Sequence, residues 1–278
     1  MTTPSVPDPT PLFAMDAPDP LTPVERLLAL AGLYTQHNDR IDLLFSSRST
    51  VRPDAYVSSV QRLEREALAC VKTVQQQRLP AIEPVTSAIV RLKQIAYLTG
   101  GATRYLTAAQ HALPDDMDLA RPHPRRGFGQ HIHQARELTA LAPATVVDSA
   151  ERIAARLPSR VRTSTAATGM DAAQRGVLLE VARGHVLVTE QYGQRGYGHT
   201  LSVDVDVLHH LEVQGLVIRE PATAPPFLSG EPPRDRVCLT GPGLSALDTV
   251  IDAPLRTNPA PGRPVPAPAT AARAHARR

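Results

Sequence analysis

The 278-residue sequence is poor in the features that mark secreted, membrane-embedded or disulfide-stabilised proteins. Its two cysteines, Cys70 and Cys238, lie far apart and outside any Cys-x-x-Cys pair, which argues against a disulfide framework and a thiolate metal site. No run approaches the roughly 18 consecutive apolar residues of a membrane-spanning helix. The first residues are acidic and proline-rich, whereas a signal peptide is basic and then apolar. We therefore expect a cytoplasmic protein with no membrane partner.

Recognisable enzyme motifs are also missing. There is no P-loop, no Gly-x-Ser-x-Gly elbow, no His-Glu-x-x-His and no acidic pair placed for acid–base chemistry. The glycines within 193–198 lie between two expected strands, so they indicate a hairpin turn and not a dinucleotide-binding loop. His131 and His133 point to different sides of a helix, which makes a metal shared with His123 geometrically awkward. These absences favour a non-enzymatic protein without a metal or other cofactor.

Charge is unevenly distributed along the chain, although the formal net charge is only +3. Lysine occurs only at Lys72 and Lys93, and arginine supplies the other basic residues, a composition that suggests a GC-rich bacterial genome. Residues 121–169 hold eight basic and three acidic side chains, and residues 253–278 hold five basic and no acidic ones. Residues 170–252 instead hold six basic and eleven acidic side chains. The two basic segments favour phosphate or acidic partners, and the acidic segment does not.

Hydrophobic periodicity predicts a helical N-terminal part. Residues 1–21 are expected to be disordered because repeated prolines fix the backbone and remove hydrogen-bond donors. Thr22 is the expected N-cap of the first helix, with Glu25 completing a capping box. Apolar spacings of three and four residues predict helices over about 22–37, 54–78, 84–99, 130–141 and 145–157. Gly100-Gly101 is expected to separate a further short helix. Short loops between these helices predict an up-and-down bundle over 22–158.

Residues 170–252 show a different pattern, in which strands alternate with helices. A helix is expected to end at Gly184, followed by a strand hairpin, and a second helix, over about 203–214, is expected to end at Gly215. Residues 159–169 have no apolar period and form the expected linker. Residues 253–278 form an expected disordered basic tail. The predicted class is therefore mainly α with a small α+β domain at the C-terminal end.

Two runs in this domain resemble the winged helix-turn-helix of bacterial MarR- and PadR-type transcription regulators. One is Leu-His-His-Leu-Glu-Val-Gln-Gly-Leu-Val-Ile-Arg-Glu at 208–220, and the other is Val-Cys-Leu-Thr-Gly-Pro-Gly-Leu-Ser-Ala-Leu at 237–247. The resemblance covers about residues 170–250. It implies a winged-helix-like C-terminal domain, in which the helix before Gly215 enters the DNA major groove and basic groups contact phosphate. Together with the bundle that the periodicity predicts, the expected architecture is an N-terminal helical bundle followed by a winged-helix-like C-terminal domain.

The resemblance and the basic segment before it together give a set of candidate DNA contacts. These are Arg219, Arg234, Arg236, His209, His210, Arg121, Arg125, Arg126, Arg160 and Arg162. The helix expected to read the DNA opposes this assignment, because it holds Asp204, Asp206 and Glu212 and no Arg or Lys. Carboxylates that face phosphates are repelled by them.

Two hypotheses therefore remain open. The chain is a non-enzymatic bacterial regulatory protein that contacts double-stranded DNA through its winged-helix-like domain and basic linker and tail. Its helical region then mediates homodimerisation or binding of another protein. Alternatively, the chain is a protein-interaction module whose winged helix no longer binds DNA. The acidic character of residues 170–252 motivates the alternative.

Overall fold

The computed structural model of the protein describes most of the chain between residues 21 and 251. The described ranges are 21–46, 53–77, 79–112, 124–157, 170–191, 194–197, 203–226 and 231–251. Residues 1–20, the predicted linker 159–169 and the predicted tail 253–278 lie outside them. Candidate contacts Arg121, Arg160 and Arg162 also lie outside, and for Arg125 and Arg126 only the backbone is described.

The described residues are mainly helical, with one small sheet, which confirms the predicted class at that level. The bundle helices are α1 (Pro23–Ser46), α2 (Pro53–Gln76), α3 (Glu83–His111), α4 (Pro124–Thr139) and α5 (Ala142–Ala154). The C-terminal elements are α6 (Ala172–Ala182), β1 (Leu187–Gln191), β2 (Gln194–Tyr197), α7 (Val205–Val213), β3 (Val217–Ala224), β4 (Arg234–Leu239) and α8 (Gly241–Val250). None of these helices combines the length and apolar composition that a bilayer span requires.

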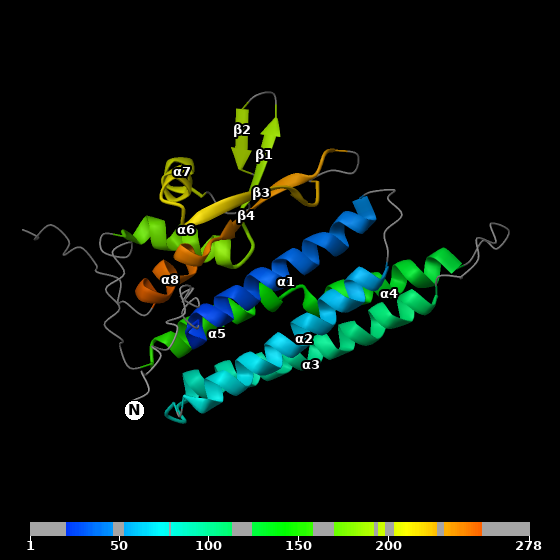
Figure 1. Cartoon of the computed structure of the whole chain (residues 1–278), viewed down its shortest axis with the longest axis horizontal. Coiled ribbons are helices and arrows are strands. Elements are labelled where there is room, and N and C mark those ends of the chain that lie inside the picture. The colour runs from blue at the N-terminus through cyan, green and yellow to red at the C-terminus, as the bar shows by residue number, and fades with distance from the viewer. Residues whose placement is uncertain are drawn as a thin grey trace, which may run out of the picture.

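The N-terminal helices alternate in direction along one long axis (Figure 1). α1, α2 and α3 run back and forth, and α4 and α5 follow one another along a single line as the fourth arm. α1 starts at the predicted capping box, in which Glu25 N–H donates to Thr22 Oγ1 at 3.0 Å and Thr22 N–H donates to Glu25 Oε2 at 2.7 Å. The side chains therefore satisfy two backbone donors that have no partner within the helix.

α3 continues through Gly100-Gly101, where the sequence predicted a break. A Cβ on Gly100 would lie 3.0 Å from Glu64 Oε1 of α2, and a Cβ on Gly101 would lie 3.1 Å from a methyl group of Leu138 on α4. The two glycines thus mark places where neighbouring helices approach α3 closely. A glycine inside a helical pattern can serve close packing as well as a helix end.

The break between α4 and α5 follows from Pro143, the second residue of α5. Proline has no N–H to donate to the carbonyl four residues earlier, here that of Thr139. The side-chain amide of Asn38 on α1 donates to this carbonyl instead, at 3.0 Å. A side chain from a neighbouring helix therefore satisfies the group that the proline leaves without a helical partner.

The sheet is antiparallel and has the strand order β2-β1-β4-β3. Gly184 and Gly215 follow α6 and α7 with φ of 75° and 70°, as the sequence predicted for helix-ending glycines. After α6, His185 N–H donates to Glu180 O at 3.0 Å, and after α7, Leu216 N–H donates to Leu211 O at 3.0 Å. These are Schellman motifs, which require a left-handed residue at the position that glycine occupies.

α1 lies between the other bundle helices and the sheet (Figure 1). One hydrophobic cluster includes Leu28 and Ala31 of α1, Val146 of α5, Leu178 of α6 and Val237 of β4. α1 also contacts β3, α6 and α8. The N-terminal helices and the C-terminal elements thus share a core across α1, and their division into separate domains stays a prediction.

Candidate functional site

The second half of α1 is polar and yet largely buried. Thr35, His37, Asn38 and Asp39 are all buried, although α1 was predicted to end near His37. Buried polar groups destabilise a fold unless they are hydrogen-bonded. Here the side chains of His37, Asn38 and Asp39 reach three different elements, α2, the end of α4 and β4.

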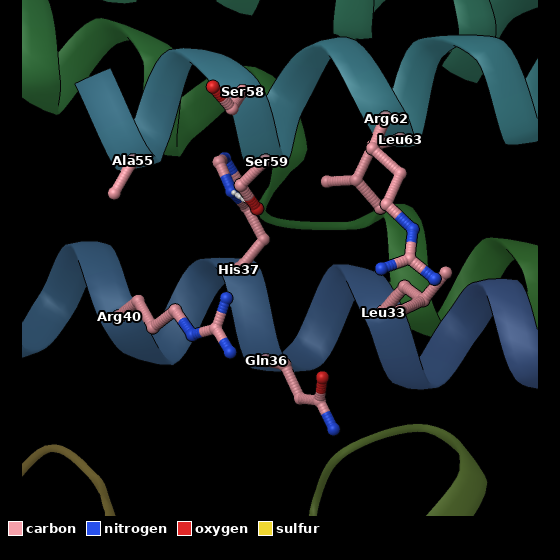
Figure 2. Close-up of a pocket in the computed structure, with 9 residues that line it drawn as sticks. All are labelled: Leu33, Gln36, His37, Arg40, Ala55, Ser58, Ser59, Arg62 and Leu63. Carbon is pink, nitrogen blue, oxygen red and sulfur yellow. Dashed lines mark hydrogen bonds between the residues drawn. The ribbon is translucent and has the colours of Figure 1, made fainter. Parts of the chain in front are cut away.

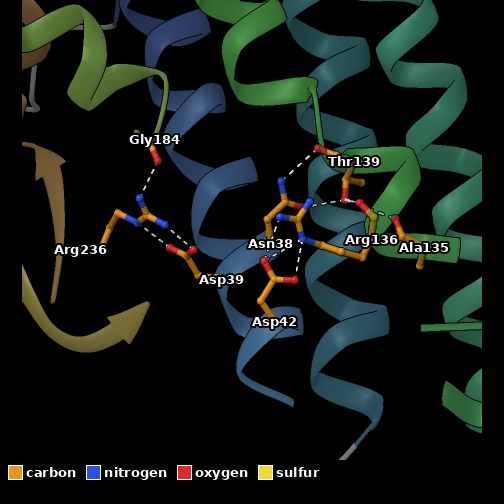
Figure 3. A network of polar contacts seen from close by, with 8 residues as sticks. All are labelled: Asn38, Asp39, Asp42, Ala135, Arg136, Thr139, Gly184 and Arg236. Atoms are coloured by element: carbon orange, nitrogen blue, oxygen red, sulfur yellow. Dashed lines mark hydrogen bonds and ion pairs between the residues drawn. The ribbon is translucent and has the colours of Figure 1, made fainter. Parts of the chain in front are cut away.

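Asp39 forms a buried ion pair with Arg236 of β4 (Figure 3). Arg236 Nε donates to Asp39 Oδ2 at 2.7 Å, and Nη2 donates to Oδ1 at 2.5 Å. The remaining Nη1 donates to the carbonyl oxygen of Gly184 at 2.5 Å. Burial raises the pKa of Asp39, and hydrogen bonding to Arg236 together with its charge opposes that rise. The guanidinium therefore bridges α1, β4 and the turn after α6.

Asn38 and Asp42 hold α4 against α1 in the same region (Figure 3). Thr139 Oγ1 donates to Asn38 Oδ1 at 2.6 Å, which adds to the amide contact at the Thr139 carbonyl. Arg136 Nε and Nη2 donate to the carboxylate of Asp42 at 2.8 to 3.0 Å. Such two-point pairs of guanidinium and carboxylate fix orientation as well as charge. This network fixes α4 against α1.

His37 lines a cavity between α1 and α2 (Figure 2). Its Nδ1 lies 3.0 Å from Ser59 Oγ, and its buried Nε2 has no hydrogen-bond partner among the described residues. Burial lowers the pKa of His37 to about 4, and the charges of Arg40 and Arg136 add to the effect. The imidazole is therefore neutral near pH 7, with one polar nitrogen left unsatisfied.

Two cavities adjoin on this flank of α1. The cavity that contains His37 has a volume of about 280 Å³, and a second, of about 190 Å³, lies between α1 and the C-terminal elements. Leu33 and Gln36 line both. The first is rimmed by polar and cationic groups, and the second is lined mainly by apolar side chains.

The three arginines predicted to contact DNA from the wing are engaged within the chain. Arg219 pairs with Glu212 of α7, with Nε donating to Oε1 and Nη2 donating to Oε2 at 2.5 Å. Arg234 Nε donates to the carbonyl oxygen of Pro225 at 2.7 Å. Arg236 is only 5% exposed, so the side chain predicted to contact phosphate lies instead in the internal pair with Asp39. In this position Arg236 is not available to DNA.

His209 and His210 lie exposed on α7, as do two valines. Val205 is 45% exposed and Val213 is 73% exposed, and His209 lies between them at helical spacing. The N-cap Asp204 accepts from the backbone N–H of Asp206 at 2.9 Å. The outward face of α7 thus combines apolar side chains with carboxylates, and within Val205–Val213 it carries no Arg or Lys.

The start of α4, which carries Arg125 and Arg126, lies far from α7 (Figure 1). Arg125 and Arg126 belong to the first turn of α4, and Figure 1 places that end of α4 at the end of the bundle away from α7. Arg121, Arg160 and Arg162 lie outside the described residues. The backbone positions that are described therefore give no single basic surface that joins this group to α7.

The described residues contain no group of three or more His, Cys, Asp or Glu side chains that could hold a metal ion. Burial raises the pKa of the Cys70 thiol to about 11 and that of Cys238 to about 12. Both thiols are therefore protonated at neutral pH, and protonated thiols are poor nucleophiles.

Sequence reasoning missed the buried polar half of α1. The available signal was the apolar period, which continues beyond His37 through Ile41 and Leu44. The partners Thr139 and Arg236 lie on distant parts of the sequence, and no local pattern connects them to α1.

Comparison with known proteins adds no assignment, because no protein-family model, no curated protein and no solved structure matches this chain.

Proposed function

We propose that this chain is a non-enzymatic regulatory protein whose C-terminal part is a winged helix that docks a protein partner through α7. The order of elements supports the winged-helix part of this proposal. β1, which follows α6, pairs with β4, and β4 pairs with β3, so the β3–β4 hairpin follows α7 as a wing would. β2 adds an edge strand where a helix-turn-helix would have its first helix.

Contacts between the two resembling sequence runs also support it. Thr240 Oγ1 donates to the carbonyl oxygens of Gly215 and Leu216, at 2.6 and 3.0 Å, and accepts from Gly243 N–H at 3.1 Å. A Cβ on Gly243 would lie 1.9 Å from Leu216 O. The Gly-Leu-Val turn after α7 and the Leu-Thr-x-x-Gly start of α8 are thus built to fit one another.

The exposed face of α7 is the observation that carries the proposed partner class. DNA-reading helices present basic or amide groups to a polyanion, whereas α7 presents Val205 beside Asp204 and Asp206 at its start and Val213 at its end. The nearby cation, Arg219, already pairs with Glu212. Exposed apolar groups with carboxylates at one end of the helix fit a protein surface that has an apolar patch and adjoining Lys or Arg side chains.

Quantitative affinity capture with α7 variants tests this function. The full chain with Val205→Ser and Val213→Ser is compared with wild type and with a matched control, Val90→Ser, on the exposed surface of α3. We expect one captured protein to be missing with the α7 variant and present with the other two chains. After purification, this protein should bind the wild-type chain directly. An identical set of captured proteins for all three chains would contradict the proposal.

DNA binding is the second candidate, and the basic composition of residues 121–169 and 253–278 favours it. Such binding would be dominated by phosphate contacts and would weaken steeply as salt rises. Fluorescence anisotropy with duplex DNA from about 50 to 200 mM salt measures it. DNA binding that depends on His209 and His210 would show that α7 contacts DNA, and it would contradict the proposed protein partner. Absence of binding at the lowest salt would exclude DNA binding as the function.

A further inference from the structure

The flank of α1 that faces both α2 and the sheet carries a polar cavity beside an apolar one. Leu33 and Gln36 line both cavities, so the two cavities lie side by side along one helix. Their volumes, about 280 and 190 Å³, together match the size of small-molecule sites, about 300–1,000 Å³. The flank lies apart from the exposed α7 face, and a ligand bound there would be independent of the proposed function.

The polar cavity has the chemistry of an anion site. Arg40 and Arg62 are exposed, line this cavity and make no hydrogen bond or ion pair with another described residue. In Figure 2 the guanidinium of Arg62 reaches from α2 toward α1, on which Arg40 lies. Ser58 and Ser59 add hydroxyl donors, and no carboxylate is among the described side chains that line the cavity. The rim residue Gln36 donates to Glu220 of β3 at 3.5 Å, which places that carboxylate on the sheet side.

The polar cavity also borders the buried imidazole of His37. This side chain is 1% exposed, and its Nε2 has no partner among the described residues. Buried polar atoms in folded proteins nearly always bond to a protein group, an ordered water or a ligand. Because this nitrogen itself has almost no accessible surface, Arg40, Arg62 and the serine hydroxyls, and not His37, are the groups available to an anion in the cavity.

The apolar cavity owes its space to Gly32. Glycine inside a helix destabilises it by about 1 kcal/mol relative to alanine, yet a Cβ at position 32 would meet no atom within 4 Å. No close approach of a neighbour therefore requires a glycine here. The missing side chain leaves room beside Leu28 of α1, Val237 and Leu239 of β4 and Leu244 of α8.

We propose that this flank of α1 binds an anionic amphiphile, an alkyl carboxylate whose head lies between Arg40 and Arg62 and whose chain lies in the apolar cavity beside Gly32. Guanidinium groups and hydroxyls match the carboxylate, and the apolar walls match the chain. The axial rise from Leu28 to Arg40 is about 18 Å at 1.5 Å per residue, which suits a medium or long alkyl chain. The alkyl chain of the bound ligand contacts both α1 and β4 and so bridges the bundle and the sheet.

Isothermal titration calorimetry of the full chain with dodecanoate, below its micelle concentration, tests this site. The head variant is Arg40→Gln with Arg62→Gln. Its control, Arg65→Gln with Arg104→Gln, removes the same charge from exposed positions of α2 and α3. The tail variant is Gly32→Leu. Dodecyltrimethylammonium has the same alkyl chain as dodecanoate but a cationic head group, and inorganic phosphate is an anion without an alkyl chain. Circular dichroism checks that each variant folds.

We expect dodecanoate to bind, the head variant to weaken binding at least about tenfold, and the control pair to leave it unchanged. Gly32→Leu is expected to weaken dodecanoate binding to a similar degree by filling the apolar cavity. Equal binding of the cationic amphiphile, or binding that the head variant leaves unchanged, would overturn the proposal. So would an absence of dodecanoate binding, or phosphate binding as tight as that of dodecanoate.

Discussion

Asp39 and Arg236, which stand 197 positions apart in the sequence, form a buried ion pair that ties the central bundle helix to the sheet. Only 6% of each side chain is exposed. In such a setting the removal of one partner costs more than the pair itself contributes, because the other charge is left buried and uncompensated.

Arg236→Met is therefore expected to destabilise the fold by about 3–5 kcal/mol. The double variant Asp39→Leu with Arg236→Met should recover most of this loss, since apolar groups of similar size replace a buried pair at little cost. Urea unfolding followed by circular dichroism measures both. Arg26→Met, which removes a partly exposed pair with Glu66, is the control and should cost less than about 1 kcal/mol. Equal losses for Arg236→Met and the double variant would contradict this account of the pair.

The stability of the fold should decrease in acid because of His37. Its pKa is about 4 in the folded chain, against an ordinary value of 6.5, so between these pH values the unfolded chain binds more protons than the folded chain. The contribution of His37 to the free energy of unfolding is therefore complete above pH 6.5. This contribution, about 3 kcal/mol, is lost as the pH is lowered from 6.5 through 4. Urea titrations of wild type and His37→Gln at pH 4, 5, 6 and 7 measure the difference. His37→Gln should lose this pH dependence, whereas His133→Gln, at an exposed site, should keep it.

Two glycines at the start of α8 offer a matched pair of substitutions. A Cβ on Gly243 would lie 1.9 Å from the backbone oxygen of Leu216, and a Cβ on Gly241 would meet no atom within 4 Å. Gly243→Ala must push α8 away from the turn after α7 and should cost at least about 2 kcal/mol. Gly241→Ala should change the free energy of unfolding by less than about 0.5 kcal/mol. Thermal and urea unfolding of the two variants should differ accordingly, and similar values would refute the contact between α8 and the turn.

The wing hairpin contains one residue with a strained backbone. Ala222 has φ of 54°, and its N–H donates to Asp235 Oδ1 at 2.9 Å, next to the register shift between β3 and β4. The left-handed conformation is unfavourable for a residue with a Cβ and costs glycine little. Ala222→Gly should therefore stabilise the fold by up to about 1 kcal/mol. Ala173→Gly, at an exposed position of α6, should instead destabilise it by about 0.5–1 kcal/mol. Urea midpoints that shift in the same direction for both variants would exclude backbone strain at Ala222.

Local chemistry predicted much of the fold. The capping box of Thr22 and Glu25, the helix-ending roles of Gly184 and Gly215, and the apolar spacing of α2 all act within a few residues, so the sequence reveals them directly. Gly100 and Gly101 were misread because the same residue type serves both helix ends and close helix packing. Only the positions of Glu64 and Leu138 distinguish the two uses.

The functional prediction was weaker because it depended on pairings over long distances. Nothing near Arg236 in the sequence shows that Asp39 neutralises it, and Arg219 was predicted to face phosphate although Glu212, on the preceding helix, accepts from it. The buried polar residues of α1 resemble a solvated helix end when only their own segment is considered. Their burial becomes visible once β4 and α4 are placed against them.

We propose that the exposed face of α7 contacts a protein. A photo-crosslinking residue at position 213, compared with one at position 97 on the exposed face of α3, tests it in cells that produce the full chain. We predict one protein adduct from position 213 that is absent from position 97 and is reduced when Asp206 is changed to Lys. Crosslinks from position 213 to nucleic acid, or the same adducts from both positions, would contradict the claim.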